Sequence, residues 1–308
     1  MTEDKTTQQV CVLMLDYGSP RSLDDIEEYY TRIRRGHRPS DEELQGLRYK
    51  YERIGGQSQL MESTAWQVKR LQEEVQNQLP LTKVTAVQGH KYIEPLIADV
   101  AKELKGYDAV VVFMMNPYGT DILNASYLEP LKPFMNDRWK IVKNWADAPT
   151  LVQSWTERVQ KTMRTLPVTA KPLYVFTAHS VPLMQGISYD GYVHSLQRVM
   201  QTMADQLALP NATLAWQSAG TRGEWLTPTV EAVTEQASTN GYTHVVYIPI
   251  GFTCTHMEVS YDLDIELREQ CEQLGMTYVR VPMPDHDTLF VTAMAHGVVN
   301  SSLEGGII

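Results

Sequence analysis

Hydrophobic positions along the chain alternate between short continuous apolar runs and longer segments in which apolar residues recur every three or four positions. The first pattern is typical of strands buried on both faces of a parallel sheet, and the second of helices that cover such a sheet. We predict strands over 10–15, 84–87, 109–115, 140–143, 173–177, 212–216, 244–250 and 276–281. We predict helices over 23–35, 40–53, 64–79, 94–104, 150–166, 192–207, 229–239 and 288–300.

The pattern of elements occurs twice. DYGSP and AHSVP each follow the first strand of a half, and GYDAVVVFMMNP resembles GYTHVVYIPIGF. Alternating strands and helices predict an α/β protein with two similar doubly wound, Rossmann-like parallel-sheet domains and a cleft between them. We place the N-terminal domain at 1–148 and the C-terminal domain at 149–308. The first half is longer, and its surplus, an insertion at about 21–60, is expected to form a lid at the cleft.

Composition limits the classes of function. The 308-residue chain has a formal net charge of −10, from 27 Lys and Arg against 37 Asp and Glu, and no basic tract, which argues against nucleic acid and anionic lipid as partners. Its hydrophobic content of 43% is ordinary for a globular chain with a real core. The polar start MTEDKTTQQV lacks the apolar segment of a secretory signal, and no apolar run nears the ~18–20 residues that span a bilayer. We therefore expect a cytoplasmic protein.

Cofactor motifs are missing from the sequence. Cys11, Cys254 and Cys271 are not paired at C-x-x-C spacing, so neither an iron–sulfur cluster nor a structural zinc site is expected. No G-x-G-x-x-G, Walker loop, G-x-S-x-G or H-E-x-x-H is present, which removes the usual signals of nucleotide cofactors, serine hydrolysis and zinc peptidases. We expect no tightly bound cofactor.

A row of acids follows the strand predicted at 244–250. Glu258, Asp262 and Glu266 recur every four positions, which on an α-helix puts three carboxylates on one face. Like charges at this spacing cost roughly 0.2–0.5 kcal/mol per pair, and no Lys or Arg lies four residues away to compensate. The row therefore fits either a divalent cation in transit or a solvated acidic face. His256 precedes Glu258 by two residues, so we expect its side chain to point away.

Several polar side chains come directly after predicted strands. Ligands of open parallel sheets bind beyond the carboxyl ends of the strands, so these side chains should converge on one cleft. His179 at such an end can take a proton or bind a metal near neutral pH, or it can be satisfied by a backbone carbonyl. The residues concerned are Asp16, Tyr17, His179, Gln217, Ser218 and Glu258.

Residues near the expected lid have two interpretations each. Arg34 ends a predicted helix, where a cation is favourable, but its guanidinium could instead clamp a substrate carboxylate. Lys50 and Tyr51, on the next predicted helix, form either a solvated face or the rim of the same pocket. Tyr17 either covers a flat ligand with its hydroxyl toward a metal or is a buried turn residue. The sequence pattern leaves these alternatives open.

Several motifs, in this order, resemble the ferrochelatase family, whose members place ferrous iron into a porphyrin. They are YGSP, YYTRIRRGHRPSDEEL, YERIGGQSQL, KYIEP, TAHSVP, WQSAG with WLTP, and GFTCTHMEVSYDLDIE, and they cover nearly the whole chain. The chain is most similar to the short form typical of Gram-positive bacteria, which uses coproporphyrin III. The resemblance implies a chelatase-like fold and an enzyme of heme biosynthesis that inserts ferrous iron, as a substrate, into coproporphyrin III to give coproheme.

The resemblance also implies roles for individual residues. His179 and Glu258 match the facing catalytic pair at the iron site, and together with Asp262 and Glu266, which match the acidic row leading outward, they are the expected metal-binding residues. Tyr17 matches a tyrosine that lies near the product iron as axial ligand. The residues that match positions lining the porphyrin and its propionates are Tyr17, Arg34, Lys50, Tyr51, Ser58 and Tyr127.

The chain departs from the family pattern beside the cleft. Tyr92 stands where histidine is common, Asp16 replaces a small residue, Lys50 stands where arginine is frequent, and the loop at 114–127 differs. Two alternatives therefore stay open: a non-catalytic tetrapyrrole carrier or regulator, and a chelatase for another metal or tetrapyrrole. The expected partners are coproporphyrin III and ferrous iron, with no nucleic acid and no integral membrane segment. Transient contact with neighbouring heme-pathway enzymes is a further expectation.

Overall fold

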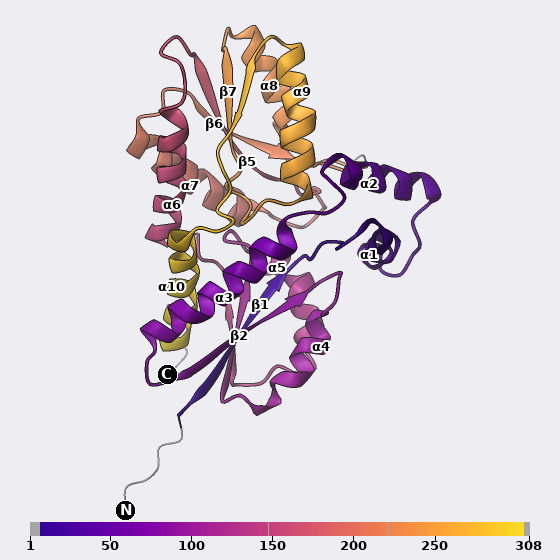
Figure 1. Cartoon of the computed structure of the whole chain (residues 1–308), viewed down its shortest axis with the longest axis vertical. Coiled ribbons are helices and arrows are strands. Elements are labelled where there is room, and N and C mark those ends of the chain that lie inside the picture. Colours follow the sequence, from indigo (N-terminus) through magenta and orange to yellow (C-terminus); the bar gives the residue numbers. More distant parts are fainter. Residues whose placement is uncertain (1–6, 147, 221, 305–308) are drawn as a thin grey trace, which may run out of the picture.

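Two four-stranded parallel sheets lie one beyond the other along the long axis of the molecule (Figure 1). The computed structural model describes residues 7–146, 148–220 and 222–304. The strand order is β2-β1-β3-β4 in the N-terminal sheet and β6-β5-β7-β8 in the C-terminal sheet, so the predicted duplicated α/β fold is confirmed. The strands are β1 Gln9–Asp16, β2 Lys83–His90, β3 Ala109–Met114, β4 Trp139–Val142, β5 Pro172–His179, β6 Ala212–Gln217, β7 His244–Ile248 and β8 Thr277–Arg280.

The central strands are buried almost throughout. Seven of the eight residues of β1 and all six of β3 are buried, because helices cover both faces of the sheet, and this explains the continuous apolar runs. β5 extends two residues beyond its predicted end, so that His179 is its last residue. β7 ends at Ile248, two residues earlier than predicted, and an irregular loop follows.

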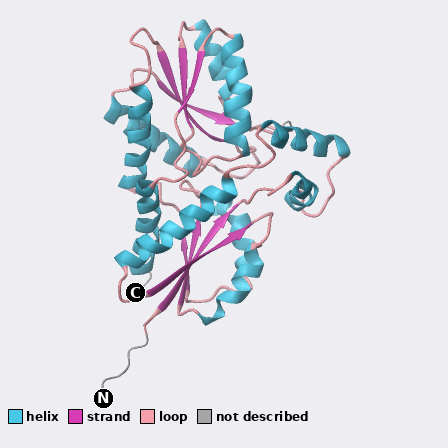
Figure 2. Cartoon of the chain, in the orientation of Figure 1, coloured by secondary structure: helices cyan, strands magenta, loops and turns pink. Residues whose placement is uncertain are grey.

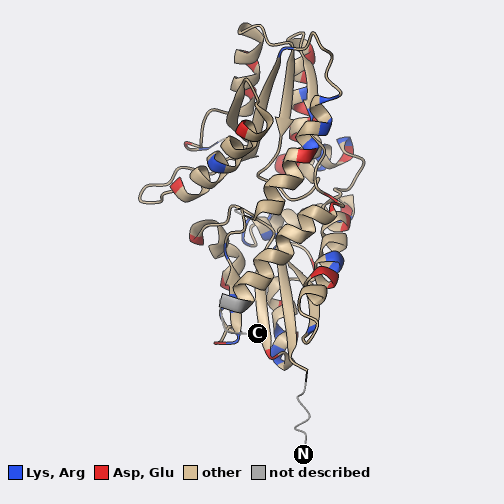
Figure 3. Ribbon diagram, turned by 90° about the vertical axis from the view of Figure 1, so that its left-hand side faces the viewer, with Lys and Arg blue, Asp and Glu red and all other residues tan. Residues whose placement is uncertain are grey.

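Helices flank both sheets (Figure 2). No helix in the described ranges is both long and apolar enough to cross a bilayer. In the view of Figure 3, acidic and basic residues are interspersed over the helices of both units. The helices are α1 Ile26–Ile33, α2 Asp41–Arg53, α3 Leu60–Gln78, α4 Ile97–Lys102, α5 Asp121–Leu128, α6 Pro149–Met163, α7 Asp190–Leu207, α8 Val230–Thr239, the π-helix η4 Glu258–Leu267, α9 Arg268–Gln273 and α10 Thr288–Glu304, with the short 3₁₀ segments η1 Leu23–Asp25, η2 Glu103–Gly106 and η3 Glu129–Leu131.

The insertion forms an arm, α1 and α2, that projects from the side of the N-terminal unit (Figure 1). α2 begins with a capping box, in which Ser40 Oγ accepts from the Glu43 backbone N–H at 3.2 Å and the Glu43 carboxylate accepts from the Ser40 N–H at 2.8 Å. Near the other end of α2, Arg53 forms an ion pair with Glu269 at 2.9 Å. The arm is therefore tied to the C-terminal unit as well as to its own.

The last helix, α10, belongs to the second half of the sequence but packs on the N-terminal sheet. It contacts α3, α6, β3 and β4. A Cβ at Gly297 would lie 3.4 Å from the Phe113 ring and 3.5 Å from Val142, so the helix approaches the sheet closely. The division of the chain between residues 148 and 149 stays a prediction, and α10 links the two units across it.

Asp287 fastens the start of α10. Its Oδ1 accepts from the Leu289 backbone N–H at 2.8 Å, while its Oδ2 accepts from Ser154 Oγ at 2.7 Å and forms an ion pair with Arg158 of α6. Burial by itself would raise the pKa of Asp287, but the Ser154 hydrogen bond and the Arg158 charge bring the pKa below its ordinary value. The folded chain therefore favours the ionised carboxylate.

We expect Asp287→Asn to lower the free energy of unfolding by about 1–2 kcal/mol at pH 7, because the charged hydrogen bonds are lost. A carboxylate with a lowered folded-state pKa stabilises the fold above its unfolded pKa, and that stabilisation is lost as the pH falls through the folded pKa. The difference between wild type and variant should therefore shrink below about pH 4. Urea unfolding at several pH values measures this, with the exposed Asp99→Asn as control. A difference that does not change with pH would contradict the assignment.

Candidate active site

A cavity of about 400 Å³ lies between the two units, at the carboxyl ends of β1, β3, β5 and β7. Both units and the arm contribute walls, as expected for a cleft in a duplicated α/β fold. The residues singled out from the sequence that line it are Asp16, Tyr17, Tyr51, Ser58, Tyr127, His179 and Glu258. Those that do not are Arg34, Lys50, Gln217, Ser218, Asp262 and Glu266.

His179, the last residue of β5, has one ring nitrogen, Nε2, without a hydrogen-bond partner among the described residues. Its Nδ1 lies 2.5 Å from the Ser180 carbonyl oxygen, which can only accept, so Nδ1 carries a proton. In the neutral ring Nε2 is then an acceptor. The Tyr192 hydroxyl donates to the His179 carbonyl oxygen at 3.0 Å and holds the backbone. The histidine is thus satisfied by a backbone carbonyl through one nitrogen and keeps the other for chemistry in the cavity.

The loop after β7 reaches the cavity by passing very close to β5. A Cβ at Gly251 would lie 2.4 Å from Ala178 Cβ and 2.6 Å from its Cα, so only glycine permits the approach. The Gly251 N–H donates to the Thr177 carbonyl oxygen at 3.0 Å. The segment that carries Glu258 is thereby held beside the strand that carries His179.

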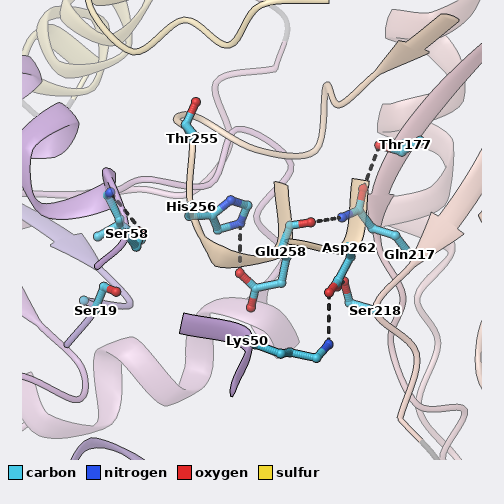
Figure 4. Close-up of polar contacts among 12 residues, drawn as sticks. Ser19, Lys50, Ser58, Thr177, Gln217, Ser218, Thr255, His256, Glu258 and Asp262 are labelled. Atoms are coloured by element: carbon cyan, nitrogen blue, oxygen red, sulfur yellow. Dashed lines mark hydrogen bonds and ion pairs between the residues drawn. The ribbon is translucent and has the colours of Figure 1, made fainter. Parts of the chain in front are cut away.

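Glu258 is the first residue of the π-helix, and its backbone is held from β5 and β6. Gln217 Nε2 donates to the Glu258 carbonyl oxygen at 3.1 Å, and Gln217 Oε1 accepts from Thr177 Oγ1 at 2.8 Å (Figure 4). π-Helical turns are rare and occur often at functional sites. Gln217, which does not line the cavity, therefore positions a residue that does.

His256 lies against Glu258, so the expectation that it points away is wrong. Its Nε2 is 3.5 Å from Glu258 Oε2 (Figure 4). Its ring packs against Phe252 at a centroid distance of 4.5 Å. His256 lies in the irregular loop at 249–256, before the helix begins, so the two-residue step to Glu258 does not turn the side chain to the opposite side as it would on a helix. The only sequence signal was a histidine near an expected metal-binding acid.

The charges of this cluster are coupled. Burial lowers the pKa of His256 below its ordinary value, which favours the neutral ring at neutral pH. Burial alone would raise the pKa of Glu258, but the His256 and His179 rings bring it below its ordinary value. The cavity therefore holds an ionised carboxylate next to a neutral imidazole, a pair that can accept protons or bind a cation.

The acidic row runs from the cavity to the surface: Glu258 lines the cavity, Asp262 is half-buried and Glu266 is exposed. The three acids lie on a π-helix rather than the α-helix assumed from their spacing. Asp262 accepts from Lys50 Nζ at 3.1 Å and from Ser218 Oγ at 2.5 Å (Figure 4). The positive charge missing from the local sequence is thus supplied by α2 of the arm.

The Asp262 carboxylate stabilises the charged form of Lys50. Burial of Lys50 would lower its pKa, but the Asp262 carboxylate raises it above the ordinary value. Within the described ranges, no three His, Cys, Asp or Glu side chains are placed to bind one metal ion. The four residues expected to bind metal therefore do not form one closed cage; His179 and Glu258 stay at the cavity while Asp262 is engaged by the arm.

Tyrosines form the opposite wall. The Tyr17 ring meets the Tyr92 ring edge-on at a centroid distance of 4.6 Å and Tyr29 at 6.3 Å, and Tyr51 Oη lies 3.0 Å from Ser19 Oγ. Burial raises the pKa of Tyr17 and Tyr51 well above the ordinary value, so their hydroxyls stay protonated. A wall of neutral aromatic rings suits a flat apolar ligand.

The remaining predicted residues hold local structure. Ser58 Oγ accepts from the Leu60 N–H at 3.1 Å, where α3 begins at the cavity. Arg34 forms an ion pair with Glu43, which ties α1 to α2 rather than reaching the cavity. Tyr127 comes from α5, a helix that was not predicted in the divergent loop; Thr120 caps it by accepting from the Leu123 N–H at 3.3 Å.

A buried acid–imidazole pair lies beside the cavity. The register of β1 and β2 puts Asp16 next to His90, and His90 Nδ1 lies 2.5 Å from Asp16 Oδ1. Their side chains are 5% and 3% exposed. The Gly18 N–H and Gln88 Nε2 donate to the same carboxylate at 2.9 and 2.5 Å. Asp16, a departure from the family pattern, is thus matched by a partner on the next strand.

Comparison with known proteins gives consistent matches over the chain. The family model described as ferrochelatase matches residues 9–302. The coproporphyrin III ferrochelatase of Geobacillus kaustophilus is 33% identical over 305 residues, 96% of this chain and 96% of that protein. The coproporphyrin III ferrochelatase of Listeria monocytogenes serotype 4b is 32% identical over 298 residues, 94% of this chain and 96% of that protein.

Two solved structures share the fold. SirB from Bacillus subtilis, with Fe³⁺, superposes with a TM-score of 0.57 at 10% identity, covering 97% of this chain and 98% of SirB. CbiX, the terminal enzyme of siroheme biosynthesis in denitrifying bacteria, gives a TM-score of 0.54 at 11% identity, covering 96% of this chain and 99% of CbiX. At these identities the likeness is one of fold.

Proposed function

We propose that this chain, which belongs to the ferrochelatase family, inserts ferrous iron into coproporphyrin III to form coproheme in heme biosynthesis. The observation that carries the proposal is the meeting of His179 and Glu258 in one cavity, opposite a wall of neutral tyrosines. The cavity thus offers proton acceptors on one side and a flat aromatic surface on the other. The N-terminal and C-terminal units supply these two sides separately.

The reaction exchanges two pyrrole protons for one ferrous ion, and the proposed roles follow that exchange. His179 Nε2 and the ionised Glu258 accept protons and replace water around the entering iron, because imidazole and carboxylate suit ferrous iron. Asp262 and Glu266 conduct iron inward along the π-helix. Entry at Asp262 then requires displacement of the Lys50 ammonium, which holds that carboxylate at 3.1 Å.

The opposite wall would hold and orient the macrocycle. Tyr17, Tyr51, Ser58 and Tyr127 line the cavity and are proposed to contact the porphyrin, with the Tyr17 hydroxyl toward the product iron. A planar macrocycle shields its nitrogen lone pairs, so a site that bends it would favour insertion. Arg34 and Lys50 can act on propionates only from the rim, after leaving Glu43 and Asp262.

We further propose that iron is only a substrate and that the protein has no resident cofactor or iron–sulfur cluster. Cys11, Cys254 and Cys271 are buried free thiols. Burial raises the pKa of Cys11 to about 12, which disfavours the thiolate that binds metals. Elemental analysis of the purified protein tests this point. A cytoplasmic location and transient contact with neighbouring heme-pathway enzymes remain proposals for fractionation and cross-linking.

Anaerobic mixing of the protein with ferrous iron and coproporphyrin III tests the function directly. The absorption bands of the free-base porphyrin should be replaced by those of coproheme at a rate proportional to protein concentration. A bound but metal-free spectrum would instead identify a carrier. Insertion of cobalt alone, or activity on sirohydrochlorin alone, would identify a different chelatase. A parallel run with protoporphyrin measures the preference between porphyrins.

A further inference from the structure

Lys91 is the one Lys or Arg among the described residues that line the cavity. It follows the end of β2 directly. Its Nζ donates to Ser126 Oγ of α5 at 2.8 Å. The ammonium lies 4.8 Å from the ring centroids of both Tyr92 and Tyr127, and 5.6 Å from that of Tyr17. Three aromatic rings and one hydroxyl thus surround the charged end of this side chain.

In the part of the chain that the structure describes, Lys91 forms no ion pair with an acid, whereas Arg34 and Lys50 each do. Burial raises the pKa of Tyr17 and of Tyr127 well above the ordinary value, so these rings offer no phenolate. Cation–π contacts of this kind stabilise an ammonium by roughly 0.5–2 kcal/mol each, which keeps the lysine in place. Two of its three N–H donors have no hydrogen-bond partner among the described residues.

The proposed substrate would bring negative charge into the cavity. Coproporphyrin III carries four propionates, and a carboxylate that enters a cavity without a partner is strongly destabilised. The cavity wall already contains two acids, Asp16 and Glu258, which repel such a group. The two cations expected from the sequence to bind propionates are engaged elsewhere, Arg34 by Glu43 and Lys50 by Asp262.

We propose that Lys91 binds a propionate carboxylate of the tetrapyrrole inside the cavity and so fixes the rotation of the macrocycle against His179 and Glu258. The inference rests on the proposed function and adds a positioning residue to it. Ser126 orients the ammonium, and Tyr17, Tyr92 and Tyr127 keep it extended toward the ligand. The altered loop that forms α5 is then part of the binding site rather than a defect in it.

Titration of Lys91→Met with coproporphyrin III, followed by porphyrin fluorescence, tests the proposal. Methionine keeps the length and apolar stem but removes the charge, so the Kd should rise about tenfold or more. Coproporphyrin III tetramethyl ester has no anionic group, and wild type and variant should bind it alike. Lys91→Arg should bind the acid more tightly than Lys91→Met, because the charge is kept although guanidinium and ammonium differ in shape. Lys102→Met, an exposed lysine paired with Asp99, is the matched control.

Three outcomes separate the possibilities. An equal loss of affinity for the acid and the ester would show that Lys91 only supports the wall, and unchanged affinity for both with a lower Tm would show a purely structural contact; either result overturns the proposal. Lys91→Gln provides a second neutral variant should Lys91→Met fail to fold. Wild-type protein that binds no coproporphyrin III would overturn the proposed function itself. The wild-type titration is done first, so this outcome is distinguished from a failure of the Lys91 proposal.

Discussion

Replacing His179 with alanine is expected to abolish iron insertion while coproporphyrin III binding is retained. Nε2 is the ring nitrogen at the end of β5 that has no hydrogen-bond partner among the described residues, and alanine removes it without disturbing the backbone hydrogen bond from Tyr192. Loss of a positioned proton acceptor lowers rates by about 10²–10⁴-fold. Glu258→Gln should have an effect of similar size, because the amide can neither accept the proton nor neutralise the iron charge. Anaerobic stopped-flow spectroscopy gives the insertion rate, and fluorescence titration gives the affinity.

His194→Ala is the control for this prediction, because His194 is an exposed histidine on α7. It should insert iron at the wild-type rate. Wild-type turnover by His179→Ala would refute the proposed role of His179. If the variant loses both tetrapyrrole binding and turnover, His179 instead maintains the shape of the cavity. Comparing the insertion rate with the affinity for coproporphyrin III in one variant therefore separates an effect on the reaction from an effect on binding.

Asp16→Ala is expected to lower the free energy of unfolding by roughly 3–5 kcal/mol, because three donors lose an acceptor and each unpaired buried group costs about 1–3 kcal/mol. His90 would remain almost fully buried with no acceptor for Nδ1, the Gly18 N–H would lose its acceptor, and Gln88 Nε2 would keep only Thr64 Oγ1. Urea unfolding monitored by circular dichroism measures the change. An effect under about 1 kcal/mol would mean that the pair contributes little.

The double variant Asp16→Ala/His90→Leu tests whether the loss of stability comes from buried polar groups left without a partner. Replacing both members of a buried pair by apolar groups is often close to neutral, because no polar group is left without a partner. The double variant should therefore regain most of the stability lost in Asp16→Ala. If it is no more stable than the single variant, the loss comes from the changed shape of the turn after β1. His90→Leu alone should also destabilise, since it leaves Asp16 with fewer donors.

The sequence was sufficient where local pattern decides structure. Continuous apolar runs predict the central strands, and the carboxyl ends of those strands predict the cavity. The sequence therefore predicts that Tyr17, His179 and Glu258 lie near one another, and all three line the cavity. The capping box of α2 was also readable, because it depends on residues three apart. These features follow from short-range chemistry and from the geometry of parallel sheets.

The rest depends on contacts between distant segments. Nothing near Asp262 in the sequence shows that Lys50, 212 positions away, supplies its counter-ion. The pairing of Asp16 with His90 depends on the register of two strands, and the direction of His256 depends on an irregular loop. A π-helix differs from an α-helix by one hydrogen-bond step, which residue spacing does not resolve. For α5, the cap at Thr120 was a usable signal that lay in a loop without a clear family match.

The position of α10 decides how the protein can be dissected. A fragment that ends at residue 148 would lack the helix that covers Phe113 and Val142, and would present that apolar surface to solvent. A fragment that begins at 149 would hold His179 and Glu258 without the tyrosine wall. Neither piece would enclose a macrocycle alone. Activity would return only on complementation, with α10 of one fragment docking onto the sheet of the other.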